Sequence, residues 1–325
     1  MILEHLTQQA RELLLAMPEV TRWPVLADRI AHFKPGSSGV GPWDYLAWAC
    51  MQAGGKVEDA VPGLAAIYTG MESIRLVDDI LDEDPEGLQH TLGAGPVANL
   101  AQALQSLGLR ALLETPVEDA RRTRMAANYS EMILNTTYGQ HRDHHANGSE
   151  ADYWEMIALK TPPLYAHALY LGATLGGAPQ QEAQALASLA PWIGQLTQIS
   201  DDLHDILQTE VDADWLSPQK NLALIYTLNT EHPHQEAFRA LLPRVSEPGV
   251  LPQLQQIIIS SGALSYALSK MAELYREVMA ATAQLPSPFD RSTPARLDYY
   301  AEQIIYVLSK TGITLTREDL LETVL

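Results

Sequence analysis

The sequence has a single cysteine, Cys50, among its 325 residues. One cysteine cannot form an internal disulfide bond, so the fold must be held together by other means. Low cysteine use is compatible with a reducing compartment, and we expect a cytoplasmic location. Cys50 lies in an apolar stretch with no histidine close to it in the sequence, which favours a core residue over a reactive thiol.

Basic residues are scarce as well. Lys and Arg number 21 against 40 Asp and Glu, which gives a formal net charge of −19. This negative charge opposes binding to a nucleic acid or to an anionic lipid surface. The sequence also lacks a charge-free apolar run of membrane-spanning length, and its first residues carry charge where a signal peptide needs an apolar core. We therefore expect a soluble protein with no integral membrane segment and no nucleic-acid partner.

Hydrophobic residues recur at helical spacing along almost the whole chain, and the alternating pattern of strands is scarce. The chain is long enough for a large core and contains no linker, so we expect one all-α domain over residues 1–325. Gly and Pro residues predict a loop at 34–42 and a helix break at 160–163. The predicted helices cover residues 3–17, 25–33, 43–53, 57–81, 96–113, 117–145, 151–175, 181–208, 219–229, 234–242, 252–259, 262–283 and 293–310.

An acidic cluster, Asp78-Asp79-Ile-Leu-Asp82, stands at the end of the predicted helix 57–81. In a helix, Asp78 and Asp82 lie on one face with Cβ atoms about 6 Å apart, and Asp79 lies beside them. Carboxylates this close repel one another, and the C-terminal end of a helix is itself partly negative. A bound divalent cation would relieve both effects, and ligands that are all oxygen favour Mg²⁺. The plain alternative is a solvated acidic helix end.

The same spacing occurs a second time, as Asp201-Asp202-Leu-His-Asp205, within the predicted helix 181–208. Gln198 lies on the same helical stripe as Asp201 and Asp205. Two such clusters on separate apolar helices would face each other across a cavity and could hold several Mg²⁺ ions around a diphosphate. The repeat therefore favours a metal site over a solvated helix end.

Two lysines stand at predicted helix breaks. Lys160-Thr161 comes just before a Pro-Pro pair, and Lys220 follows Pro218. A lysine at such a break can aim its ammonium group at a phosphate. The plain alternative is a lysine that reaches from a helix end into solvent, and without the acidic motifs that interpretation is preferred.

Other polar residues have simpler interpretations. His141, His144 and His145 have a spacing that could bind zinc, although a polar helix end is the more ordinary explanation. Arg75 lies four residues before Asp79 and would form an ordinary helix salt bridge with it, or else face the acidic site.

In combination, these residues resemble the motifs of the trans-isoprenyl diphosphate synthases, the polyprenyl synthetase family, over nearly the whole chain. Asp78-Asp79-Ile-Leu-Asp82 is similar to the first aspartate-rich motif of that family. Gln198-Ile-Ser-Asp201-Asp202-Leu-His-Asp205 resembles the second, with Thr197 in place of Phe. The intermediate and following segments of the family are resembled by Gly139-Gln140-His-Arg-Asp143, Lys160-Thr161 and Lys220-Asn-Leu-Ala-Leu-Ile-Tyr.

The resemblance implies an isoprenoid synthase-type helical bundle around a central apolar cavity, usually in a homodimer. It also implies Mg²⁺, about three ions per active site, on the diphosphate of an allylic prenyl substrate. In the family, metals and cationic side chains stabilise the departing diphosphate, and the apolar cavity shields the carbocation from water. The residues that the resemblance assigns to the metals are Asp78, Asp79, Asp82, Asp201, Asp202 and Asp205.

The resemblance assigns further residues to the substrate. Lys160 and Lys220 would contact the diphosphate, and Gln140, Thr161 and Gln198 would lie near the reacting carbon. Lys160, Thr161 and Gln198 are the candidates for a catalytic role. The residues just ahead of Asp78, among them Ser73 and Ile74, would set the length of the prenyl chain, and the small Ser73 permits depth.

Two segments depart from the family pattern. The basic segment Gly-Gly-Lys-Arg-x-Arg-Pro, which holds isopentenyl diphosphate in the family, is replaced here by Gly36-Ser-Ser-Gly-Val-Gly-Pro42. The Arg-Arg-Gly after the first motif is replaced by Pro85-Glu86-Gly87. An anionic cosubstrate would lose several charge-assisted contacts, each worth about 1.5 to 3 kcal/mol.

We therefore predict a Mg²⁺-dependent prenyltransferase whose acceptor need not be isopentenyl diphosphate and can be neutral. One alternative is a terpene synthase-like enzyme, in which the cation is quenched by its own double bonds or by water. The second motif lacks the usual spacing for that class, because position 209 is Thr and Glu210 comes one residue late. Another alternative is a non-catalytic subunit of a heteromeric synthase, although such a subunit has no need for six clustered carboxylates.

Overall fold

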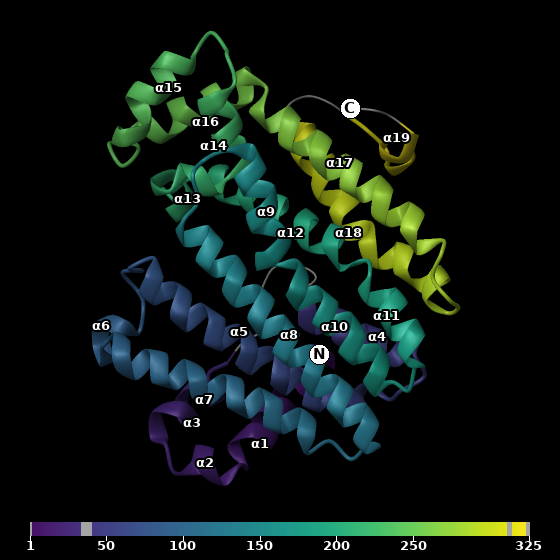
Figure 1. Ribbon diagram of the computed structural model, residues 1–325. Coiled ribbons are helices and arrows are strands. Elements are labelled where there is room, and N and C mark those ends of the chain that lie inside the picture. Colours follow the sequence, from purple (N-terminus) through teal and green to yellow (C-terminus); the bar gives the residue numbers. More distant parts are fainter. Residues whose placement is uncertain (1, 34–40, 311–313, 323–325) are drawn as a thin grey trace. The chain divides into compact units, whose positions relative to one another are not determined.

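The computed structural model describes residues 2–33, 41–310 and 314–322 (Figure 1). Every regular element in these residues is an α-helix or a short 3-10 helix, so the predicted all-α class is confirmed. Most of the predicted loop at 34–42 lies outside the described residues. Within the described part, no helix is both long and apolar enough to cross a membrane.

The chain divides into two compact units. The first consists of Met1–Gln140, Pro163–Ala190 and Leu285–Ser292. The second consists of His141–Pro162, Pro191–Gln284 and Thr293–Leu325. That the two make up one domain stays a prediction.

The first unit is built mainly from the N-terminal half of the chain. Two of its long helices, α5 and α7, run side by side, and α1 packs against α5 (Figure 1). Its elements are α1 (Ile2–Leu15), α2 (Pro18–Thr21), α3 (Pro24–Ala31), α4 (Pro42–Gln52), η1 (Val57–Ala60), α5 (Val61–Leu81), α6 (Gln89–Leu92), α7 (Ala94–Leu113), nearly all of α8 (Asp119–His144) and α10 (Pro162–Leu175), and α11 (Gln180–Ala187).

The central helix of this unit is α5, which is buried along most of its length. A Cβ atom at Gly108 of α7 would lie 2.5 Å from Thr69 Oγ1 and 2.5 Å from the Tyr129 hydroxyl, so glycine is required for the close approach of α7. The hydroxyl groups of Thr7 and Tyr68 lie 2.7 Å apart and connect α1 to α5. These contacts fix the position of the α5 end that carries the first acidic motif.

The second unit contains the other helices, with α17 and α18 lying next to each other (Figure 1). Gln255 of α16 donates hydrogen bonds to the carbonyl oxygens of Ile206 and Gln208, and so satisfies acceptors at the end of α12. Its elements are α9 (Glu150–Lys160), α12 (Ala190–Ile206), α13 (Ala213–Leu216), η2 (Pro218–Lys220), α14 (Leu222–Asn229), α15 (Gln235–Leu241), η3 (Leu242–Arg244), α16 (Val250–Ser261), α17 (Ala263–Thr282), most of α18 (Phe289–Lys310), and α19 (Arg317–Glu322).

Several predicted helix boundaries were wrong, and the short helices α2, α6, α13 and α19 were not predicted. The predicted helix 181–208 is two helices, α11 and α12, because Pro191 has no N–H to continue a helix and starts a new one instead. The helix predicted to begin at 293 begins at Phe289 and contains Pro294. Phe289 is fully buried against Trp48, with ring centroids 6.4 Å apart, and this packing outweighs the cost of the proline.

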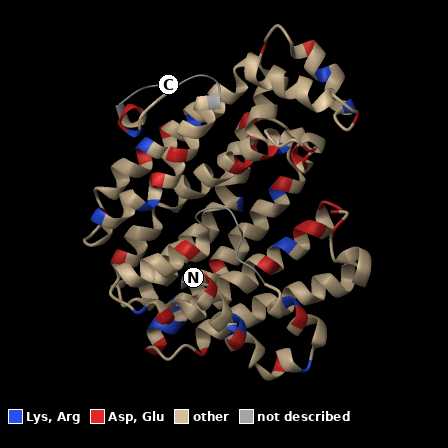
Figure 2. Ribbon diagram, turned by 180° about the vertical axis from the view of Figure 1, so that it is seen from behind, with Lys and Arg blue, Asp and Glu red and all other residues tan. Residues whose placement is uncertain are grey.

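Acidic residues are spread over both units and outnumber the basic ones (Figure 2). The helix break predicted at 160–163 is present, since α9 ends at Lys160 and α10 begins at Pro162. Cys50 is buried, as expected for a core residue, and its pKa is raised to about 12 by burial and by the charge of Asp59. A thiol with such a pKa is protonated at neutral pH and unreactive.

Candidate functional site

The first acidic motif closes α5. Asp78 and Asp79 lie in the last turn of the helix, and Asp82 caps its end with an N–H that donates to the Asp78 carbonyl oxygen at 2.9 Å. Asp82 is exposed, Asp78 is half-buried, and carboxylate oxygens of the two lie within 4.8 Å of each other. Asp79 is buried, with 8% of its surface exposed. The i, i+4 pair is therefore the part of the motif that a dissolved cation can reach.

Three further predicted residues lie near this end of the first unit. Gln140 of α8 is buried, and its Nε2 donates to Asp78 Oδ1. Ser73 is fully buried, and its hydroxyl has no hydrogen-bond partner among the described residues. Ile74 is half-buried. The structure thus joins Gln140 to the first motif, while the roles of all three residues stay predictions.

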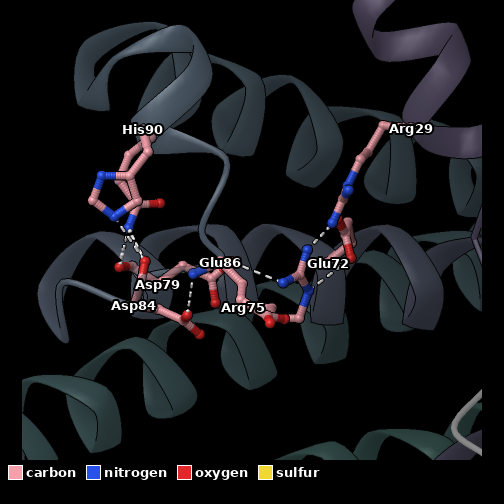
Figure 3. Close-up of polar contacts among 8 residues, drawn as sticks. Arg29, Glu72, Arg75, Asp79, Asp84, Glu86 and His90 are labelled. Carbon is pink, nitrogen blue, oxygen red and sulfur yellow. Dashed lines mark hydrogen bonds and ion pairs between the residues drawn. The ribbon is translucent and has the colours of Figure 1, made fainter.

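Asp79 is paired with arginine rather than exposed to a cation (Figure 3). Arg75 Nη1 donates to Asp79 Oδ2 at 2.8 Å, as predicted from the spacing, and Arg75 also donates to both carboxylate oxygens of Glu72 at 3.1 and 3.3 Å. Arg29 of α3 donates to Glu72 as well. Burial raises the pKa of Glu72 and of Asp79, and the charge of Arg29 opposes both shifts.

The turn after α5 is closed by its own hydrogen bonds. Asp84 Oδ1 accepts from the Glu86 N–H at 2.8 Å, and the Asp84 carbonyl oxygen lies 2.9 Å from His90 Nε2 (Figure 3). Gln89 Nε2 donates to the carbonyl oxygen of Asp79 at 2.6 Å. Pro85 and Glu86 therefore lie in a hydrogen-bonded turn at the positions where the family pattern has two arginines, and Asp84 precedes them.

The second acidic motif lies on the last turns of α12, in the second unit. Its middle residue, Asp202, is 2% exposed. Asp202 Oδ2 accepts from the Tyr153 hydroxyl at 2.7 Å and from the Leu222 N–H at 3.0 Å, and Oδ1 accepts from Gln198 Nε2 at 3.1 Å. Asp202 is thus engaged with its own unit and joins α12 to α9 and α14.

The outer acids of this motif belong to a crowded group. Carboxylate oxygens of Asp205, Asp212 and Asp214 lie within 4.8 Å of one another. Burial and the charges of Asp212 and Asp214 raise the pKa of Asp205 to about 7, and burial raises the pKa of Asp202 to about 8. Although the Asp201 side chain is exposed, partial desolvation of its carboxyl group and the charge of Asp214 raise its pKa to about 6.

The two predicted lysines meet at one buried carboxylate. Lys160 Nζ and Lys220 Nζ lie 3.1 and 3.0 Å from the same oxygen, Asp143 Oδ2, and the Asp143 side chain is 1% exposed. The interpretation of both lysines as residues that reach outward from helix ends is therefore wrong. Next to Lys160, the Thr161 hydroxyl donates to Gln198 Oε1 at 3.0 Å.

The helix geometry of α12 depends on a small residue. A Cβ atom at Gly194 would lie 2.5 Å from Pro162 Cα, so α12 can approach the break after α9 this closely only at a glycine. This contact brings Gln198 within reach of Thr161, and the predicted catalytic residues Lys160, Thr161 and Gln198 are neighbours as a result.

The acidic groups fit a hard divalent cation. All their ligand atoms are carboxylate oxygens, and three carboxylates within 4.8 Å repel one another unless a cation lies between them or a carboxyl group takes up a proton, as the raised pKa of Asp205 indicates. In the part of the chain that the structure describes, the three histidines at 141, 144 and 145 form no comparable group. His145 Nδ1 is instead 2.8 Å from the His141 carbonyl oxygen, so the zinc alternative is not supported.

Several residues of these sites were not among the residues predicted from the sequence. Asp212 and Asp214 lie beyond the motif spacing, although an Asp-x-Asp pair soon after an acidic helix end is a signal that could have been used. Asn221 Nδ2 donates to the Asp202 carbonyl oxygen and to Asp214 Oδ2, and nothing in its sequence context predicts this. That the two motifs face each other stays a prediction, since they belong to different units.

Comparison with known proteins gives concordant matches. A profile of the polyprenyl synthetase family matches residues 48–257. The short chain isoprenyl diphosphate synthase of Methanothermobacter thermautotrophicus is 32% identical over 167 residues, which are 48% of this chain and 51% of that protein. The chain thus spans about half the length of that relative. The geranylfarnesyl diphosphate synthase of Aeropyrum pernix is 25% identical over 293 residues, which are 83% of this chain and 92% of that protein.

The fold has close counterparts among solved structures. A polyprenyl synthetase from Streptomyces coelicolor superposes with a TM-score of 0.74 over 92% of this chain and 98% of that chain. The two sequences are 19% identical, so this match establishes the isoprenoid synthase fold alone.

Proposed function

Because this chain belongs to the polyprenyl synthetase family, we propose that it is a Mg²⁺-dependent prenyltransferase of the isoprenyl diphosphate synthase type. Its substrate is an allylic prenyl diphosphate, which it ionises, and it transfers the prenyl group to an acceptor. The names of the relatives, all diphosphate synthases, agree with this class of reaction.

One observation in the second unit carries the proposal. Two lysine ammonium groups share the Asp143 carboxylate, and the charges of both Lys160 and Asp143 act on the pKa of Asp214 in the nearby acidic group. Cation-binding carboxylates and cationic side chains are therefore neighbours. A diphosphate held through metal ions needs both, because each phosphate oxygen must meet either a metal or a hydrogen-bond donor.

We assign the metal ligands to the acids that reach solvent. These are Asp78 and Asp82 on α5, and Asp201 and Asp205 on α12, with Asp212 and Asp214 beside Asp205. When bound, Mg²⁺ supplies charge neutralisation for the leaving diphosphate. Asp79 and Asp202 do not ligate the metals in this assignment, because arginine and hydrogen-bond donors already occupy them.

The other residues bind and orient the substrate. Lys160 and Lys220 exchange the Asp143 oxygen for diphosphate oxygens and so favour departure of the leaving group. Thr161 and Gln198 hold each other at 3.0 Å and keep polar groups near the reacting carbon. Ser73 and Ile74 lie ahead of the first motif and set the room for the prenyl chain. The enzyme acts in the cytoplasm as a homodimer.

We further propose that the acceptor is not isopentenyl diphosphate. The basic segment of the family is absent from 36–42, and the turn after the first motif carries Pro85 and Glu86 where two arginines are expected, with Asp84 just before them. In that turn Asp84 Oδ1 accepts from the Glu86 N–H, so a second diphosphate would meet the held Asp84 carboxylate and the exposed Glu86 side chain. A neutral acceptor avoids this repulsion.

One assay tests the proposal. The purified protein is incubated with Mg²⁺ and geranyl, farnesyl or geranylgeranyl diphosphate, with and without isopentenyl diphosphate, and the products are identified by mass spectrometry. Parallel reactions contain a neutral nucleophile, such as an indole or a phenol, as acceptor. We expect diphosphate release with transfer of the prenyl group to the neutral acceptor, and no chain elongation with isopentenyl diphosphate. Elongation would contradict the assignment of the acceptor, a cyclic hydrocarbon or an alcohol would favour the terpene synthase-like alternative, and the absence of turnover would favour a non-catalytic subunit.

A further inference from the structure

Four charged side chains of the first unit form a continuous chain of ion pairs that ends on the first acidic motif (Figure 3). We call Arg29, Glu72, Arg75 and Asp79 the charge chain. Arg29 of α3 donates to Glu72 Oε1, and Arg75 donates to Glu72 through Nη2 at 3.1 Å and Nε at 3.3 Å. Arg75 Nη1 then donates to Asp79 Oδ2 at 2.8 Å.

The acids of the charge chain are buried and the arginine between them is not. The side chains of Glu72 and Asp79 are 10% and 9% exposed, whereas that of Arg75 is 47% exposed. Removing a charged partner from a buried carboxylate is costly, so the two acids hold the arginine in place. The four charges sum to zero, two positive and two negative.

The position of Arg75 in the helix gives it a choice of partners. It precedes Asp78 by three residues and Asp79 by four, and residues at both spacings are neighbours on a helix surface. The guanidinium is turned to Asp79, and two of its nitrogens are bonded to Glu72. Glu72 therefore determines the side of the helix on which Arg75 places its charge.

We propose that Arg75 is a positioning residue for the metal site. Held by Glu72, it neutralises Asp79 and keeps that carboxylate away from the cation, so that the first motif presents Asp78 and Asp82 as its ligand pair. The inference rests on the proposed function, because it assigns Arg75 a part in the same site.

Charge arithmetic gives opposite signs for two substitutions. Glu72→Gln changes the sum of the charge chain from zero to +1 and releases the guanidinium toward Asp78. Arg75→Met changes the sum to −1 and leaves Asp79 as a third carboxylate next to Asp78. Over roughly 10 Å in a partly screened environment, one unit charge changes the affinity for a divalent cation by about three- to tenfold.

The test measures cation binding directly, with Mn²⁺ as the probe and the electron paramagnetic resonance signal of free Mn²⁺ as the readout. The full-length protein is compared with Glu72→Gln, Arg75→Met and Arg75→Lys. Asp78→Asn identifies the binding phase that belongs to the first motif. Arg110→Met is a matched control, because Arg110 of α7 also joins two acids, Glu19 and Glu114, elsewhere in the first unit.

We expect the Mn²⁺ dissociation constant of the first motif to rise about three- to tenfold in Glu72→Gln and to fall by a similar factor in Arg75→Met. It should stay within about twofold of the wild-type value in Arg75→Lys, which keeps the charge, and in Arg110→Met. Circular dichroism and thermal unfolding show whether each variant is folded.

Two results would overturn the inference alone. One is a shift of the dissociation constant in the same direction in Glu72→Gln and Arg75→Met. The other is loss of thermal stability with unchanged Mn²⁺ binding, which is what a purely structural ion pair between α3 and α5 would give. Failure of the wild-type protein to bind Mn²⁺ at all would overturn the metal site of the proposed function together with this inference.

Discussion

The same Asp-Asp-x-x-Asp spacing occurs at the ends of α5 and α12, but the buried carboxylate has different partners at the two ends. On α5 the buried middle residue, Asp79, is neutralised by Arg75. On α12 the buried middle residue, Asp202, accepts three hydrogen bonds, and no arginine takes part in them. In both cases the second aspartate of the motif anchors the helix in its unit while the first and third reach outward, because adjacent residues on a helix point about 100° apart.

Burial raises the pKa of the middle aspartate at both ends, and at Asp79 the charge of Arg29 opposes the shift. Around α12 the pKa values of Asp201, Asp202 and Asp205 are raised to about 6, 8 and 7. The same Asp-Asp-x-x-Asp spacing therefore contains an acid that is paired with arginine on α5, and on α12 it belongs to a crowded group of acids that a bound cation would stabilise. This difference also indicates where a metal ion would contribute most to stability.

The largest effect should come from removing one outward acid from either end. We expect Asp78→Ala and Asp201→Ala each to lower the rate of diphosphate release by about a hundredfold or more, because each removes a ligand that holds charge on the leaving group. The rate is measured with saturating Mg²⁺, and circular dichroism checks the fold. A near wild-type rate in one of the two would mean that only one motif is used.

The next effect concerns the two anchoring acids and is measured as the free energy of unfolding in urea. Asp202→Ala should cost about 2 to 4 kcal/mol, because it leaves buried donors of Tyr153 and Leu222 without an acceptor. Asp79→Ala should cost about 1 kcal/mol or less, because the half-exposed Arg75 can turn to water. Equal losses would show that the two anchors are equivalent.

The pH dependence of stability should differ between the two ends in the absence of metal. The pKa of Asp205 is about 7 in the folded protein against an ordinary value of 3.8, so the folded state binds this proton more tightly than the unfolded state. Its contribution to stability is therefore present in acid and is lost as the pH rises from about 4 to about 7.

The measurement is thermal unfolding of the metal-free protein and of Asp205→Asn between pH 5 and pH 8. The wild-type protein should lose on the order of 1 to 3 kcal/mol relative to the variant over this range, and added Mg²⁺ should restore it. Parallel curves for the two proteins would contradict the raised pKa.

The smallest expected effect is on the free energy of unfolding and concerns two hydroxyl groups, of which one has a hydrogen-bond partner and the other has none among the described residues. Thr197 on α12 has its hydroxyl 2.7 Å from that of Tyr300, whereas the Ser73 hydroxyl on α5 has no partner among the described residues. Thr197→Val should therefore destabilise the protein by about 1 kcal/mol, and Ser73→Ala should be neutral or stabilising by up to about 1 kcal/mol. The free energy of unfolding of both variants is measured in urea. A lower stability of Ser73→Ala would contradict the absence of a partner for that hydroxyl.

Helical periodicity and the positions of proline predicted most of the fold. They correctly predicted the long helix that ends in the first motif and the break between Lys160 and Pro162. They failed at Pro294, where the burial of Phe289 against Trp48 extends the helix backward. Such long-range packing is not encoded in a local pattern.

The candidate site was predictable where its members share one helix. The spacing of Asp78 and Asp82 indicated a pair, and the pair is present. The burial of Asp79 and Asp202 was not predictable from the spacing. For Asp79 it depends on the contact of Arg75 with Glu72, and for Asp202 it depends on Tyr153, which lies on another helix. The meeting of Lys160 and Lys220 at Asp143 likewise requires three separate segments of the chain.

The Asp143 carboxylate has a consequence for compounds designed to block this protein. In the proposed mechanism the Asp143 oxygen must leave both ammonium groups before a diphosphate can contact them, so an anionic inhibitor that binds no metal ion exchanges one anion for another there and gains less from its charge than the metal-bound substrate does. Simple phosphate mimics should therefore be weak blockers. Compounds that carry their own metal-chelating groups, or that leave the Asp143 contacts intact, are better starting points.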